Sequence, residues 1–144
     1  MSKGKIAGGG FTSLALSAAL YLVTRAWYVS VWDRQNLEIS VSMTIGIALC
    51  ALSIFAALVG TWLLFPHRAT RLILTLVHVL ISAPTIVGSA LDIWDYLSAS
   101  GYNGFGSVIF ILIGNSALPI AACVSLGTGV VKAASLMKPP APAP

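Results

Sequence analysis

The chain has 144 residues, of which 58% are hydrophobic, only eight are Lys or Arg and only four are Asp or Glu. With a mean hydropathy of +0.94, it has too few polar side chains to cover the surface of a water-soluble globular domain. The net charge of +4 comes from basic residues near predicted helix ends, so it does not indicate nucleic-acid binding. The composition predicts an all-α, integral membrane protein.

Four apolar stretches with short links between them account for nearly the whole chain. About 20 apolar residues cross a bilayer as a helix, because the backbone finds no hydrogen-bond partner in lipid. The predicted helices cover residues 6–32, 40–65, 70–94 and 107–131. They leave no room for a soluble domain, so residues 1–144 are predicted to be one four-helix bundle. Its Pro/Ala-rich tail covers residues 132–144.

The first stretch follows a basic N-terminal segment and ends in aromatic residues. Its apolar run exceeds the roughly 7–15 residues of a signal-peptide core, so we expect a retained helix. Trp and Tyr concentrate where a membrane meets water, and such residues occur near the ends of three stretches. The predicted interface anchors are Trp27, Tyr28, Trp32, Trp62 and Trp94.

The charged residues are sorted between the two ends of the predicted helices. Basic residues gather on the cytoplasmic side of short loops. We therefore predict that both termini and the turn at 66–70 lie on the inner (cytoplasmic or matrix) side, and that the links 33–39 and 95–106 lie outside. The inner set is Lys3, Lys5, Arg68, Arg71, Lys132 and Lys138, and the outer set is Asp33, Arg34, Glu38, Asp92 and Asp95.

Arg25 and two acidic residues are the main candidates for a polar site within the membrane. Asp92 and Asp95 are three residues apart, so they share a helix face and repel each other by about 0.2–0.5 kcal/mol. A nearby cation relieves this repulsion, and Arg25 or Arg34 is the natural candidate. The sequence favours a structural ion pair of Arg25 with these acids. Conduction of ions or protons through the same residues is the alternative.

Small residues at four-residue spacing mark the faces on which helices pack in lipid. They serve either packing within the bundle or docking of other membrane subunits. Pro84 and Pro119 lie within the third and fourth helices, where proline tends to kink a helix. The predicted packing faces contain Gly46 and Cys50 in the second helix, and Ala117, Ala121, Ser125 and Gly129 in the fourth.

His78 lies inside the third predicted helix, and we expect it to form a hydrogen bond to a neighbouring helix. Ligation of a haem or quinone by His78 is an alternative. A haem would need its second ligand from another chain, because His67 lies about 16 Å away along the helix axis. Asn115 is also expected to form a packing hydrogen bond.

Cys50 and Cys123 are predicted at different depths, so they do not form a disulfide. The sequence contains no catalytic triad or phosphate-binding loop, so we predict no enzyme activity and no cofactor.

The layout resembles that of MARVEL-type four-span proteins. The resemblance covers the topology, the Arg25 in the first helix and the Asp92 in the third. It implies a protein that organises membranes by self-association. Claudin-like and tetraspanin-like classes do not fit, because the predicted outer links contain no cysteine.

Taken together, these features predict a non-catalytic accessory or scaffold subunit of a larger membrane assembly. Its expected partners are other membrane subunits and lipids, or further copies of itself. One alternative is a MARVEL-like self-associating organiser. Another is a small ion or proton channel or transporter that uses Arg25, Asp92, Asp95 and His78.

Overall fold

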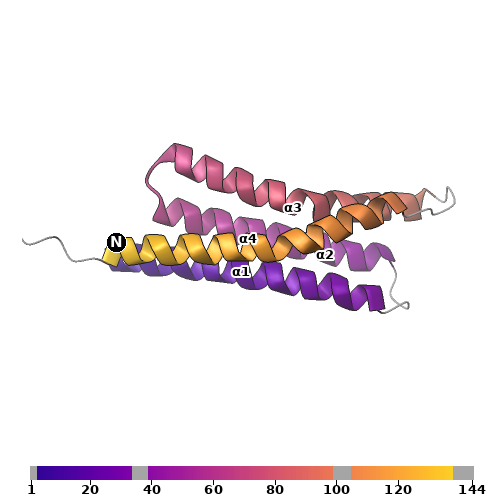
Figure 1. The fold of residues 1–144 in the computed structure, drawn as a ribbon, viewed down its shortest axis with the longest axis horizontal. Helices are drawn as coiled ribbons and strands as arrows, with labels where there is room; N and C mark the ends of the chain where they lie inside the picture. The colour runs from indigo at the N-terminus through magenta and orange to yellow at the C-terminus, as the bar shows by residue number, and fades with distance from the viewer. Residues whose placement is uncertain (1–2, 34–38, 99–104, 138–144) are drawn as a thin grey trace, which may run out of the picture.

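The computed structural model describes residues 3–33, 39–98 and 105–137. These residues form four helices: α1 (Lys3–Asp33), α2 (Ile39–Leu64), α3 (Arg68–Leu97) and α4 (Phe105–Met137) (Figure 1). All four are long and apolar enough to cross a membrane. The prediction of an all-α membrane four-helix bundle is confirmed, and the chain is a multi-pass membrane protein.

Helices α1, α3 and α4 extend beyond the predicted apolar stretches at both ends, whereas α2 begins at Ile39 and ends at Leu64, one residue before its predicted end. α3 continues from Trp94 to Leu97, and α4 continues from Val131 to Met137. At a rise of about 1.5 Å per residue, the 33 residues of α4 exceed a hydrocarbon core of about 30 Å. The first part of the predicted tail is therefore helical. Its remainder, 138–144, lies outside the described residues, as do the link residues 34–38 and 99–104.

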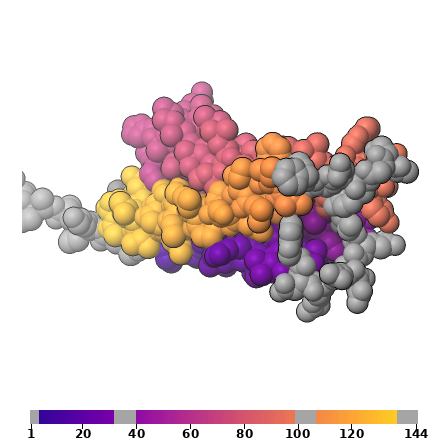
Figure 2. Space-filling view, turned by 45° about the vertical axis from the view of Figure 1, so that its right-hand side comes forward, coloured from indigo at the N-terminus to yellow at the C-terminus, as the bar shows by residue number. Residues whose placement is uncertain are grey.

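The four helices are arranged in a ring in chain order. α1 packs against α2 and α4, α3 packs against the same two helices, and α1 and α3 face each other diagonally. The space-filling view shows α4 running along one face between α1 and α3 (Figure 2). Consecutive helices are antiparallel, because short links join them at alternate ends of the bundle (Figure 1).

The two ends of the bundle differ in charge. The α2–α3 turn, the start of α1 and the last turns of α4 lie at one end, which we call the basic end and which carries Lys5, Arg68, Arg71 and Lys132 (Figure 1). The opposite end, called the acidic end, carries Asp92 and Asp95 at the close of α3. This grouping is the one that the charge pattern predicts.

The interior holds small and polar side chains, whereas large apolar side chains cover the outside. Leu14, Tyr21 and Leu118 are among the few large residues that are fully buried. Trp94, Leu72 and Phe55 are examples of side chains more than 60% exposed. Lipid is as apolar as a leucine core, so small and polar residues gain more than large apolar ones by facing a neighbouring helix.

Candidate functional site

The most polar surface in the bundle is the inward face of α3. Its buried residues recur every three or four positions, with Gly88 and Ser89 adjacent, so they form one line along the helix. This line, called the polar face of α3, is polar or glycine at every position. It consists of His78, Ser82, Thr85, Gly88, Ser89 and Asp92.

Tyr21 of α1 reaches across the bundle to the first two residues of this face, His78 and Ser82. Its hydroxyl lies 3.3 Å from His78 Nδ1 and accepts a 3.3 Å hydrogen bond from Ser82 Oγ. The Tyr21 and His78 rings are stacked, with centroids 5.9 Å apart and planes 8° apart. Both side chains are at most 2% exposed. Since Ser82 donates to the tyrosine oxygen, Tyr21 can donate its own proton to an unprotonated His78 Nδ1. The contact fits the interhelical hydrogen bond expected of His78.

Tyr28 makes a second diagonal contact, nearer the acidic end. Its hydroxyl lies 2.5 Å from Ser89 Oγ, and Ser89 Oγ donates to the Thr85 carbonyl 2.8 Å away. Tyr28 is therefore the donor to Ser89. Gly46 makes room for the ring, because a Cβ at that position would lie 2.2 Å from the Tyr28 hydroxyl. The contact thus depends on a tyrosine and a glycine on adjacent helices.

Asp92 lies at the last buried position of the polar face and is 4% exposed. Ser107 Oγ, in the first turns of α4, donates to Asp92 Oδ1 over 2.9 Å. This bond gives the carboxylate a polar contact from a neighbouring helix, which a buried carboxylate requires. Asp95 is only partly buried.

The structure does not bring Arg25 to these acids. Arg25 is exposed on the outer side of α1, and no ion pair joins it to Asp92 or Asp95 in the described parts of the chain. The reason is the ring order: α1 and α3 are diagonal, and only side chains on the inward face of α1, such as Tyr21 and Tyr28, reach α3.

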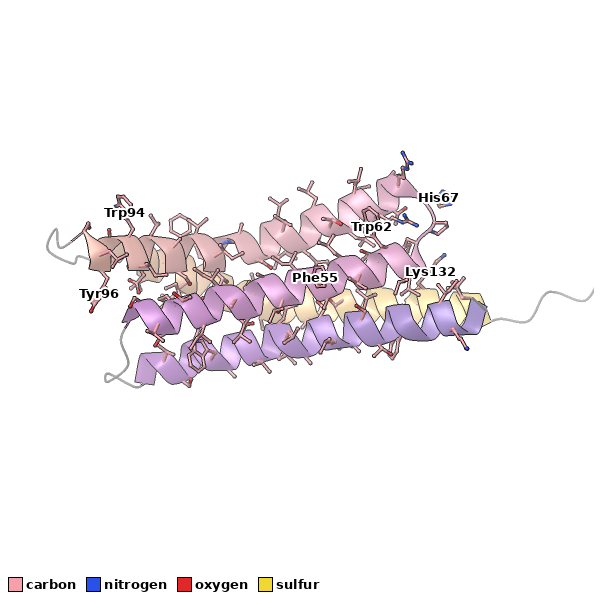
Figure 3. The ribbon with its side chains drawn as sticks, turned by 180° about the vertical axis from the view of Figure 1, so that it is seen from behind. Phe55, Trp62, His67, Trp94, Tyr96 and Lys132 are labelled. Carbon is pink, nitrogen blue, oxygen red and sulfur yellow. The ribbon has the colours of Figure 1, made fainter. Side chains whose placement is uncertain are left out.

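The predicted aromatic anchors divide into two groups. Trp62 and Trp94 are 58% and 70% exposed and lie toward opposite ends of the bundle, as expected of interface residues (Figure 3). Tyr28 instead is 3% exposed, and Trp27 donates its Nε1–H to the Ser42 carbonyl over 2.9 Å. These two connect α1 to its neighbours rather than to the membrane surface. The side chain of Trp32 lies outside the described set.

The predicted packing faces lie inside the bundle. Ala121, Ser125, Gly129, Gly46 and Cys50 are buried, and Ala117 is partly buried. Ser17 links three helices here: it donates to the Ser53 carbonyl over 2.8 Å, and its hydroxyl lies 3.3 Å from that of Ser125. These faces are therefore occupied by the chain's own helices.

Sequence reasoning missed a second row of small residues, on the outside of α1. Gly8, Thr12, Ala19 and Ala26 are exposed at helical spacing, and a Cβ at Gly8 would meet nothing within 4 Å. The signal in the sequence was the spacing itself. The spacing could not show which of two small rows on α1 faces inward.

Asn115 differs from its expected role. Its Oδ1 is buried and has no hydrogen-bond partner among the described residues, as is also true of Thr85 Oγ1.

Cys50 is buried, Cys123 is exposed, and both are free thiols. Within the described ranges, no group of three His, Cys, Asp or Glu side chains could hold a metal ion.

No protein-family model matches this chain, and no curated protein or solved structure is detectably similar to it. Function must therefore be argued from geometry. Chemically, the polar face of α3 forms hydrogen bonds to α1 and α4. Its His78 and Asp92, together with Tyr21 of α1, are titratable groups buried inside the bundle. The outside of α1 offers a charged residue and small residues to the membrane.

Proposed function

We propose that this chain is a non-catalytic accessory or scaffold subunit of a larger membrane-protein assembly, and that its partner docks on the outer face of α1. The observation that carries the proposal is the exposure of Arg25 on this face. Charged residues within membrane spans usually pair with one another or face a cavity. An acidic side chain from another subunit would satisfy Arg25.

The surroundings of Arg25 suit helix docking. Leu22 and Val29 lie one helical turn to either side on the same face and are 49% and 52% exposed. Ala19 and Ala26 beside them are also exposed, and small residues let two helix backbones approach closely. A partner helix would therefore find a close-packed contact next to a positive charge that no ion pair within the described residues neutralises.

A native pull-down tests the proposal. The tagged chain would be purified in gentle detergent as wild type, Arg25→Leu and Ala19→Leu, with quantitative mass spectrometry of co-purifying proteins. We expect one or more foreign membrane subunits in stoichiometric yield with wild type and a strong loss with both variants. Ala90→Leu is the matched control, because Ala90 is an exposed alanine on α3. A homo-oligomer without foreign subunits would contradict the proposal and favour the self-associating organiser.

A small proton or ion transporter is the second candidate, and the buried line from His78 to Asp92 favours it. Buried ionisable residues within a membrane bundle mark ion and proton paths. Against it, the same interior is tightly filled: a Cβ at Gly114 would lie 2.0 Å from Thr85 Oγ1, and one at Gly88 would lie 2.8 Å from Phe110. Flux measured in liposomes separates the two candidates. The transporter requires a flux that Asp92→Asn abolishes, whereas the subunit shows none.

A further inference from the structure

Two hollows at the basic end share one arginine. The smaller, of about 370 Å³, is lined by Trp62, Arg68, Arg71 and Leu72. The larger, of about 500 Å³, lies beside it between the ends of α1, α2 and α4 and is also lined by Arg71. Figure 3 shows Trp62, His67 and Lys132 gathered at this end of the bundle, far from Trp94 and Tyr96.

Arg71 is held in place between these hollows. Its guanidinium carbon lies 5.3 Å from the centre of the Trp62 ring, and its Nε–H donates to the Phe65 carbonyl. A guanidinium has five N–H donors in a planar fork. No other hydrogen bond uses them within the described residues, so four donors are left for a ligand.

The smaller hollow opens toward the membrane rather than toward the bundle interior. Trp62 and Leu72 are 58% and 67% exposed, and Arg68 is exposed. Trp and Arg side chains together are typical of the level of the lipid headgroups. Below it on α3, Leu76 and Leu80 are also exposed and continue an apolar surface toward the membrane centre.

The charge of the smaller hollow selects the type of headgroup. Its lining contains two arginines and no acidic residue. Lys132 adds a third cation close by, with its Nζ 5.5 Å from the centre of the Phe65 ring. Asp92 and Asp95 lie at the opposite end. A zwitterionic headgroup would bring an ammonium next to these cations, whereas an anionic phospholipid brings a phosphodiester whose charge is not balanced within the headgroup.

We propose that the hollow formed by Trp62, Arg68, Arg71 and Leu72 binds the headgroup of an anionic phospholipid. The two guanidinium groups hold the phosphodiester, because the planar fork of arginine matches phosphate oxygens. The acyl chains lie along Leu72 and Leu76. Basic hollows between membrane helices are known to take such headgroups. The site lies on α2 and α3, so it is independent of the partner face proposed on α1.

Native mass spectrometry of the protein released from nanodiscs tests this site. The nanodiscs would contain equal amounts of phosphatidylglycerol and phosphatidylcholine. We expect wild type to retain phosphatidylglycerol preferentially. The preference should fall about fivefold in Arg68→Gln and about thirtyfold in Arg68→Gln/Arg71→Gln. Arg71 also contacts the α2–α3 turn, so the single Arg68 variant keeps the test valid if the double variant is damaged.

The control variant is Lys3→Gln/Lys5→Gln. Like the double arginine variant it removes two positive charges, but it removes them from the N-terminal end of α1. It should keep the preference. Three results would overturn the site: equal retention of both lipids by wild type, an equal loss in the lysine control, or no loss in Arg68→Gln. Displacement of the retained lipid by added glycerol phosphate would show that a soluble phosphate, not a lipid, is the ligand.

Discussion

At the scale of single residues, glycines determine how closely the helices approach. A Cβ on Gly114 would lie 2.0 Å from Thr85 Oγ1 and 2.7 Å from the Thr85 backbone nitrogen. Backbone atoms cannot rotate away as a side chain can, so α3 and α4 would have to separate. Gly127, on the outside of the same helix, has nothing within 4 Å of its Cβ position.

Replacement of these two glycines should therefore have opposite effects. We expect Gly114→Ala to destabilise the bundle by about 1–3 kcal/mol through overpacking. Gly127→Ala should be neutral or stabilising by up to about 1 kcal/mol, because alanine favours the helix. Unfolding in increasing concentrations of dodecyl sulfate measures the stability of each variant. The readout is the reaction of buried Cys50 with a thiol reagent, in a Cys123→Ser background. Equal stability of the two variants would contradict the close α3–α4 contact.

The individual contacts were only partly predictable from sequence. The sequence indicated that Tyr28 lies near a helix end, but it could not show that Gly46 leaves space for the ring inside the bundle. The positions of Trp62 and Trp94 were easier to predict, since both are exposed near the ends of their helices, as the single-helix pattern indicates. The interior role of a tyrosine depends on its partner helix, and single-helix patterns contain no such information.

At the scale of the elements, α3 is polar inside and apolar outside. The inward residues Ser82 and Ser89 are 0% exposed, whereas the outward residues Leu80 and Val87 are 61% and 43% exposed. A water-soluble helix has the opposite arrangement. This inversion is what membrane packing requires, because the lipid accepts leucine but not an unpaired hydroxyl.

Single cysteines on α3 should report this inversion to a membrane-soluble maleimide. In a background without Cys50 and Cys123, we expect Ser82→Cys and Ser89→Cys to react at least about tenfold more slowly than Leu80→Cys and Val87→Cys. The difference corresponds to local opening that costs about 1.4 kcal/mol or more. If all four positions reacted alike, α3 would not be packed with its polar face inward.

Which helices lie diagonally was beyond the sequence. The sequence made Arg25 a candidate partner for Asp92, because both are charged residues toward the same end of the predicted bundle. The direction in which each side chain points depends on helix rotation and on the ring order, in which α1 contacts α2 and α4. Two tyrosines, rather than an arginine, therefore connect α1 with α3.

At the scale of the whole molecule, the charge asymmetry predicts the orientation in the membrane. The basic end carries the α2–α3 turn and the ends of α1 and α4, and basic residues favour the cytoplasmic side. The four apolar stretches and their short links were enough to predict the bundle, because only a helix satisfies its own backbone in lipid.

An impermeant thiol reagent applied to intact cells tests this orientation. In a cysteine-free background, we expect Tyr96→Cys at the acidic end to be labelled, since Tyr96 is 45% exposed. His67→Cys and Ser135→Cys at the basic end, both exposed positions, should be labelled only after the cells are made permeable. The reverse pattern would show that the basic end is outside.

The central claim is that the outer face of α1 contacts another membrane protein. Photocrosslinking in intact membranes tests it most directly, with a photoreactive amino acid at Leu22 or Ala26 of α1 and at Leu80 or Val87 of α3. We predict that the α1 positions crosslink to one defined foreign membrane subunit and that the α3 positions crosslink mainly to lipid. Crosslinks from α1 to lipid alone, or to a second copy of this chain, would contradict the account.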